Sequence, residues 1–124
     1  MAISENQTCI TLEAAADLSA KQYYFVAVDS NGKAALTGDD GNPIGVLQNK
    51  PTAGQAATIC VDGVTKVYVQ ESDGLGAGYN VGCGSASAAK VSDTASYRLG
   101  VSLEAASADG DIISLLFQKN GKQA

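Results

Sequence analysis

The residues of this chain that could do chemistry are carboxylates and cysteines, because its 124 residues include no histidine. Histidine is the commonest general base and the commonest metal ligand in proteins. Acidic residues gather in two loops, residues 29–32 (Asp-Ser-Asn-Gly) and 39–42 (Asp-Asp-Gly-Asn). A calcium-binding EF-hand loop starting at residue 29 would need glycine and glutamate where Ala34 and Asp40 stand. We therefore interpret both loops as solvated turns and predict no metal site and no catalytic residue.

Two further patterns fall short of a site. Residues 74–78 (Gly-Leu-Gly-Ala-Gly) are similar to a nucleotide-binding loop, but the third glycine of that motif would fall at Tyr79 and no helix begins there. Cys9, Cys60 and Cys83 have neither zinc-site spacing nor the even number of a disulfide framework. We expect free thiols, no cofactor and no enzymatic activity.

Charge and hydropathy limit the possible partners. The formal net charge is −5 and the isoelectric point is about 4.4, so the chain repels the phosphates of nucleic acids. No apolar stretch reaches the roughly 18 residues of a membrane-spanning helix. The first five residues (Met-Ala-Ile-Ser-Glu) do not read as a secretory signal, so we expect synthesis in a cytoplasm. The length suits one domain.

Short apolar segments separated by turn residues predict an all-β fold. Residues 9–14 alternate between apolar and polar side chains, as in a half-buried strand, although residues 12–18 also suit a helix. We predict a small compact sandwich or barrel of short antiparallel strands. Besides 9–14, strands are expected at residues 23–28, 33–36 (after a turn at Asn31-Gly32), 44–47, 90–92, 97–103 and 112–117.

The strongest strand signal, residues 57–69, contains an Asp-Gly pair in its middle. This pair predicts a hairpin with a three-residue loop around Gly63. That register would place Ile59 opposite Thr65, on the same apolar face as Val67.

Residues 112–117 (Ile-Ile-Ser-Leu-Leu-Phe) carry apolar side chains on both faces of the expected strand. The strand is therefore predicted to be central in its sheet or to lie at a contact between subunits. Ile112 and Leu116 share the second face and are candidate subunit-interface residues. Tyr68 is a third candidate, because tyrosine is a large, stiff contact residue with one polar end.

A pattern of apolar residue, glycine and valine occurs twice. Residues 44–46 (Ile-Gly-Val) recur as residues 99–101 (Leu-Gly-Val), 55 positions later, and Gly54 recurs 56 positions later as Gly110. Any β-rich chain can repeat such a triplet by chance, which is the alternative. We interpret the match as two similar β units within one domain. The predicted boundaries are an N-terminal arm at 1–10, a β domain at 11–117 with units at about 17–70 and 75–117, and a frayed tail at 118–124.

The chain resembles a family of small phage-encoded capsid decoration (cement) proteins, the DUF2190 family. The segments that carry the resemblance are residues 17–23, 28–33, 43–51, 53–58, 63–67 and 99–110, which together span most of residues 17–117. The chain departs from the family pattern at Lys21, where a glycine is often found, and in its longer polar start.

The resemblance implies a non-enzymatic protein on the outer capsid surface of a virion. Such a protein binds the assembled head and bridges subunits of the major capsid protein, commonly as a homotrimer at local three-fold positions. It also implies a core similar to the β-tulip of other head decoration proteins.

We expect the N-terminal arm to contact the capsid by adding a strand to a sheet edge. The candidate capsid-contact residues are Ile3, Ser4, Glu5, Asn6, Gln7 and Thr8. The alternative is a small ligand- or carbohydrate-binding β module of a tail or adhesin, with the glycine-rich loops and tyrosines as its binding rim.

Overall fold

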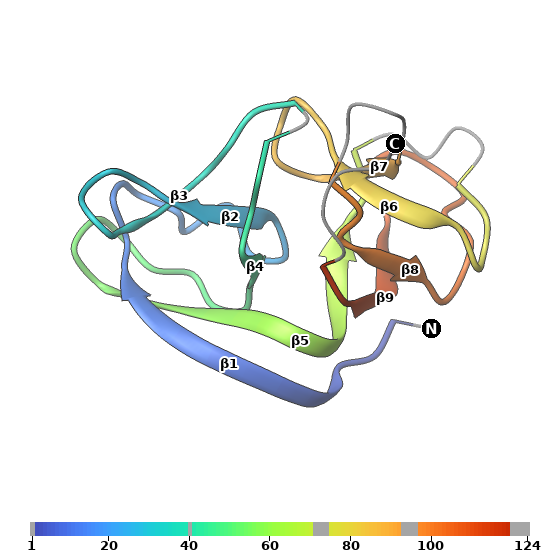
Figure 1. The fold of residues 1–124 in the computed structure, drawn as a ribbon, viewed down its shortest axis with the longest axis horizontal. Helices are drawn as coiled ribbons and strands as arrows, with labels where there is room; N and C mark the ends of the chain where they lie inside the picture. The colour runs from blue at the N-terminus through green and yellow to red at the C-terminus, as the bar shows by residue number, and fades with distance from the viewer. Residues whose placement is uncertain (1, 40, 71–74, 93–96, 120–124) are drawn as a thin grey trace.

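The computed structural model describes residues 2–39, 41–70, 75–92 and 97–119, and the regular elements in these ranges are all β-strands. The predicted all-β fold of antiparallel strands is confirmed (Figure 1). None of these ranges contains a helix long and apolar enough to cross a membrane. The strands are β1 (Glu5–Glu13), β2 (Phe25–Val28), β3 (Ala34–Ala35), β4 (Gly45–Leu47), β5 (Ala56–Tyr68), β6 (Asn80–Cys83), β7 (Ala89–Val91), β8 (Gly100–Ser102) and β9 (Ile112–Phe117).

The nine strands form one sheet in the order β3-β2-β4-β5-β9-β8-β6-β7, with β1 paired to β5 off this path. β5 runs from one half of the molecule to the other, with β1 along its first part and β9 beside its end (Figure 1). β9 lies between β5 and β8, which confirms the central position that its two apolar faces predict.

β5 is one continuous strand of 13 residues, so the predicted hairpin within residues 57–69 is wrong. Gly63 has a φ of 112°, and a Cβ atom there would meet the backbone carbonyl of Asn6 in β1. The glycine therefore allows a close approach of two backbones at an irregular point of the β1–β5 ladder and does not reverse the chain. Consequently Ile59 and Val67 lie in separate hydrophobic clusters and not on one shared face.

The sheet contains one arrangement of strands twice. β4 pairs with β2 and β5, while β2 also pairs with β3. In the same way β8 pairs with β6 and β9, while β6 also pairs with β7. Gly45 and Gly100, the glycines of the sequence repeat, hold the same place in β4 and β8.

Each residue pair of the first arrangement has an equivalent pair in the second. The equivalent residue is found by adding 55 to the residue number up to the turn at Gly54, and by adding 56 after that turn. β1 therefore corresponds to the second part of β5, and the first part of β5 corresponds to β9. We call residues 9–61 the first repeat and residues 64–117 the second repeat, boundaries that differ from the 17–70 and 75–117 of the sequence prediction. Matching pairs are Phe25/Val46 with Asn80/Val101, Val28/Ala34 with Cys83/Ala89, and Leu12/Ala57 with Val67/Ile113.

Each repeat has its own hydrophobic cluster. Phe25 and Val46 of the first repeat join the cluster of the second repeat, where the Phe25 ring lies 6.4 Å from that of Phe117. The remaining apolar residues of the first repeat form a smaller cluster around Val26, Leu47 and Ile59. The two repeats are therefore held together by side chains that cross from the first into the core of the second.

The two repeat glycines give a direct test of this arrangement. A Cβ atom at Gly45 would meet the carbonyl of Cys60, and one at Gly100 would meet the carbonyl of Leu116. We expect Gly45→Ala and Gly100→Ala each to lower the free energy of unfolding by about 2 kcal/mol or more, because neighbouring strands must move apart. Gly38→Ala is the control, since nothing lies within 4 Å of its added Cβ, and should change it by no more than about 0.5 kcal/mol. Urea unfolding measures all three.

Candidate functional site

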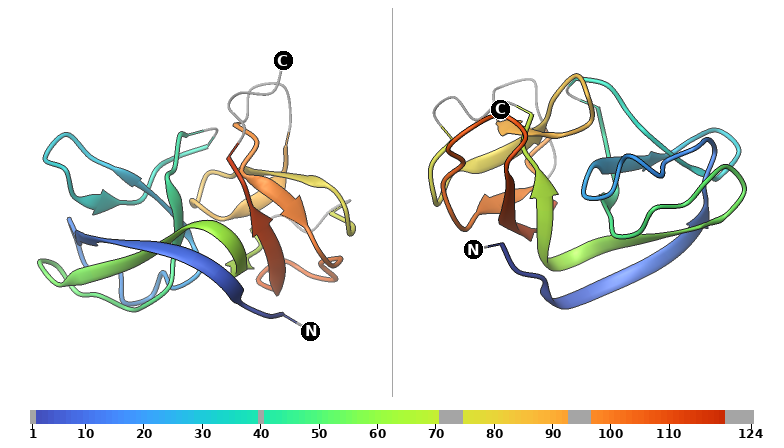
Figure 2. Two further views of the ribbon diagram at one scale, coloured as in Figure 1. Left: turned by 60° about the horizontal axis from the view of Figure 1, so that its bottom comes forward. Right: turned by 180° about the vertical axis from the view of Figure 1, so that it is seen from behind.

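The six predicted capsid-contact residues do not form a free arm, because they lie against the sheet. Glu5 to Thr8 belong to β1, which lies beside β5 in both views of Figure 2. The Ile3 N–H donates to Ser114 Oγ at 2.8 Å, and the Gln7 amide donates to the Val64 carbonyl at 3.0 Å. One strand therefore runs across the predicted boundary between an arm at 1–10 and a β domain at 11–117.

Residues 5–8, the first part of β1, give no strand signal because they carry no apolar side chain. The side chains of β1 are mostly exposed, and the strand is held by its backbone ladder to β5. The helix that residues 12–18 could also have formed does not occur. Ile3, Ser4, Glu5, Asn6 and Thr8 are exposed and Gln7 is half-buried, so this segment still presents a surface to a partner.

The three predicted subunit-interface residues lie on one face of β5 and β9. Tyr68 is directly opposite Ile112, and Val64 is directly opposite Leu116. Opposite residues of a ladder share a face, and every second residue along a strand returns to it. Ile112 and Leu116 are exposed, whereas Tyr68 is half-buried.

Tyr68 already has a partner within the chain. Its ring stacks on that of Tyr24, with centroids 4.7 Å apart, and the Lys21 ammonium lies 4.8 Å from the Tyr24 centroid. Burial, together with the contact to Tyr68, raises the pKa of Tyr24. Because Tyr24 lies in the first repeat and Tyr68 in the second, this stack is part of the junction between them.

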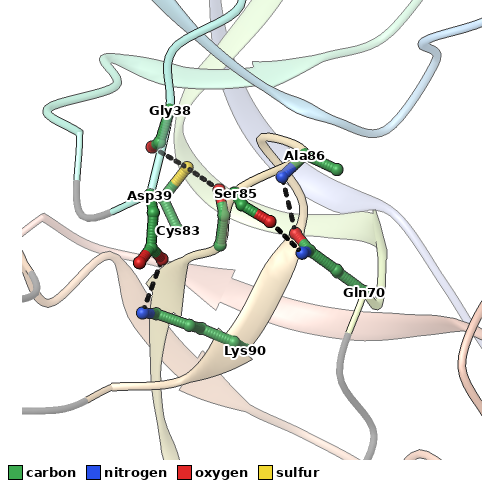
Figure 3. Close-up of polar contacts among 8 residues, drawn as sticks. Gly38, Asp39, Gln70, Cys83, Ser85, Ala86 and Lys90 are labelled. Atoms are coloured by element: carbon green, nitrogen blue, oxygen red, sulfur yellow. Dashed lines mark hydrogen bonds and ion pairs between the residues drawn. The ribbon is translucent and has the colours of Figure 1, made fainter.

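A polar network also crosses this junction (Figure 3). The Lys90 ammonium of β7 lies 2.8 Å from Oδ1 of Asp39, in the loop after β3. The Cys83 thiol donates to the Gly38 carbonyl at 3.6 Å. Beside them the Gln70 side chain donates to Ser85 Oγ and accepts from the Ala86 N–H, which fixes the loop between β6 and β7. No local sequence pattern indicates this network.

The acidic loops behave as turns where the structure describes them. Oδ1 of Asp29 accepts hydrogen bonds from the backbone N–H groups of Asn31 and Lys33, both at 2.9 Å, which confirms the predicted turn between β2 and β3. Asp40 and Gly74 lie outside the described residues. Among the described residues, no three cysteine, aspartate or glutamate side chains gather in a group that could hold a metal ion.

The three cysteine thiols differ in exposure. Cys9 and Cys60 are directly opposite in the β1–β5 ladder, with Cys9 exposed and Cys60 fully buried. Burial raises the pKa of Cys60 to about 11. Cys60 is therefore a core residue and not a nucleophile.

A solved structure shares this fold across nearly the whole chain. It is the head fiber gp8.5 N base of bacteriophage phi29, with a TM-score of 0.72 over 95% of this chain and 99% of that chain, at 15% sequence identity. No protein-family model matches the chain, and no curated protein matches its sequence. The resemblance to capsid decoration proteins therefore stays a prediction, while the shared fold is established.

The ion pair at the junction should contribute more than an exposed pair. The Lys90 side chain is only 10% exposed, whereas Lys33, which pairs with Glu13, is 40% exposed. We expect Asp39→Asn to lower the free energy of unfolding by about 1 kcal/mol and Glu13→Gln by no more than about 0.5 kcal/mol. Equal effects in urea unfolding would contradict a special role for the junction pair.

The thiols should differ in reactivity, because the thiolate is the reactive form. In the folded protein at pH 7.5, we expect iodoacetamide to modify Cys9 at least about tenfold faster than Cys60. Mass spectrometry of peptides from a timed reaction measures both rates, and unfolding in urea should remove the difference. Equal rates in the folded protein would show that β1 opens readily from β5.

Proposed function

We propose that this chain is a non-enzymatic structural protein of a phage head. It decorates the outer surface of the assembled capsid as a homotrimer and bridges subunits of the major capsid protein. The observation that carries the proposal is the whole-chain likeness in fold to a phage head fiber base, which covers 95% of this chain and 99% of that one. The sequence resemblance to capsid decoration proteins supports the same function independently.

Such a protein stabilises a shell by mass action, because it binds the assembled lattice and not the dissociated subunits. Each contact can be weak, since one molecule that holds two neighbouring coat subunits converts the second binding event into an intramolecular one. A small rigid sheet suits this function. It places its contact groups at fixed distances and loses little conformational entropy on binding.

The outer edge of β1 is the part of the N-terminal segment best suited to add a coat-protein strand. The Ala14 N–H donates to the Gln55 carbonyl at 2.8 Å, so inward and outward backbone groups alternate from this point back along β1. The N–H and C=O groups of Thr11 therefore point away from β5. Among the described strands β1 forms a ladder only with β5, and a bridge from Ala14 to Ala34 closes its far end. The outer edge before Glu13 is therefore open to strand addition.

A proline at the outer edge tests strand addition. Thr11→Pro removes an outward N–H without breaking a bond to β5, so we expect the protein to stay folded but to lose at least about tenfold in capsid affinity. Thr11→Ala is the matched control, because it removes the side chain and keeps the N–H. Co-sedimentation with expanded capsids of the parent phage measures binding, and circular dichroism confirms folding.

The outcomes separate the mechanism from the function. If Thr11→Pro binds as well as Thr11→Ala, this edge is not the capsid contact. If the wild-type protein does not sediment with capsids at all, the proposed function itself is wrong.

A further inference from the structure

The junction between the two repeats buries one surface of each repeat. The first repeat contributes Phe25, Val46 and Cys60, which are all fully buried on one face of β2, β4 and β5. Phe25 and Val46 pack into the cluster of the second repeat, and so they close the side of that cluster that faces the first repeat. The first repeat thus inserts side chains at the junction, and the second repeat receives them. We call the first kind of surface the presenting surface and the second kind the receiving surface.

In the second repeat, most residues of the presenting surface are exposed. Phe25 corresponds to Asn80, which is exposed, and Cys60 corresponds to Leu116, which is 36% exposed. Tyr24, which stacks across the junction, corresponds to Tyr79, which is 47% exposed. We call this surface the forward face; its residues are Tyr79, Asn80, Val101, Leu103 and Leu116.

Leu103 belongs to the forward face for the same reason. It corresponds to Gln48, whose amide donates across the junction to Thr65 Oγ1 at 2.7 Å. In the second repeat the equivalent side chain is apolar and 45% exposed.

The receiving surface of the first repeat is open in a complementary way. Ile10 and Val28 are 40% and 47% exposed, whereas their counterparts Thr65 and Cys83 are buried beneath the first repeat. Leu12, Ile44 and Val61 of the first repeat show the same difference, because they are only half-buried. Their counterparts in the second repeat, Val67, Leu99 and Phe117, are fully buried. We call this surface the receiving face; its residues are Ile10, Leu12, Val28, Ile44 and Val61.

We propose that copies of this chain associate head to tail, with the forward face of one copy packed on the receiving face of the next. The occupant is a second copy because the chain already joins a surface of each kind at its own junction. Of the eight large hydrophobic side chains exposed in the described part of the chain, five lie on these two faces. A contact between two different surfaces closes into a ring when its rotation permits.

This inference rests on the self-association in the proposed function and specifies its interface. A closed homotrimer would display six repeats around one axis. It also narrows the predicted interface, since Leu116 belongs to the forward face while Ile112 does not. The counterpart of Ile112 is Ala56, which is exposed even though the first repeat is covered at the junction. Tyr68 is already used within the chain.

Charge substitutions on each face provide the test. We expect Leu116→Asp and Val28→Asp each to weaken self-association at least about tenfold, because a carboxylate would have to be buried in an apolar contact. Ile112→Asp is the matched control from the same strand and should associate like the wild type. Analytical ultracentrifugation and native mass spectrometry measure the oligomers, and circular dichroism with thermal unfolding confirms that each variant folds.

Mixing the two variants distinguishes head-to-tail contact from a symmetric one. The Leu116→Asp variant keeps an intact receiving face, and the Val28→Asp variant keeps an intact forward face. An equimolar mixture should therefore form a one-to-one heterodimer and stop there. No heterodimer, or an Ile112→Asp variant as impaired as Leu116→Asp, would overturn the proposal. A wild type that binds capsids and stays monomeric would overturn this inference and the proposed homotrimer, and would leave the capsid binding intact.

Discussion

The structure depends on the length and continuity of β5. A strand has two edges, and the first part of β5 uses both of them, for β1 and for β4. Its second part continues far enough to pair with β9, on which the second half of the sheet is built. If the chain turned at Gly63, each half would retain only a few short strands and a core too small to be stable alone. One shared strand therefore converts two marginal units into a single domain.

Glycine has different tasks at different places in this fold. At Gly63 the positive φ accompanies an irregularity that brings β1 and β5 close together. At Gly45 and Gly100 the absence of a side chain allows a neighbouring strand carbonyl to lie where a Cβ atom would be. An Asp-Gly pair between apolar runs usually signals a hairpin. Here the glycine allows β1 and β5 to approach closely. Local sequence does not distinguish this function from a hairpin turn, because the residue that Gly63 approaches, Asn6, is 57 positions away in the chain.

Local patterns predict most strands but not their assembly. Strands β2, β4 and β9 follow from sequence because each is a short apolar run bounded by turn residues. β1 follows only in part: the alternation in residues 9–14 predicts its second part, whereas residues 5–8 are held by backbone pairing and their side chains are mostly exposed. The junction network was equally hidden, because Lys90 and Asp39 are brought together only by the packing of one repeat on the other. The repeat glycines were the available signal. Extending their 55-residue shift along the chain aligns Tyr24 with Tyr79 and Gln48 with Leu103.

A tandem repeat has a general difficulty at its ends, because each unit buries a face against its neighbour and the terminal units have no neighbour. Repeat proteins solve this with terminal units whose outer faces are polar. This chain does the opposite at several positions: Thr65 and Gln48 at the covered junction correspond to the exposed Ile10 and Leu103 at the open ends. In a protein that functions as a monomer, apolar residues in place of polar ones at solvent-facing positions would only increase the risk of aggregation. It is the pattern expected when the two ends are interior surfaces of a larger assembly, so the apolar ends are better explained as interfaces than as defects of a small core.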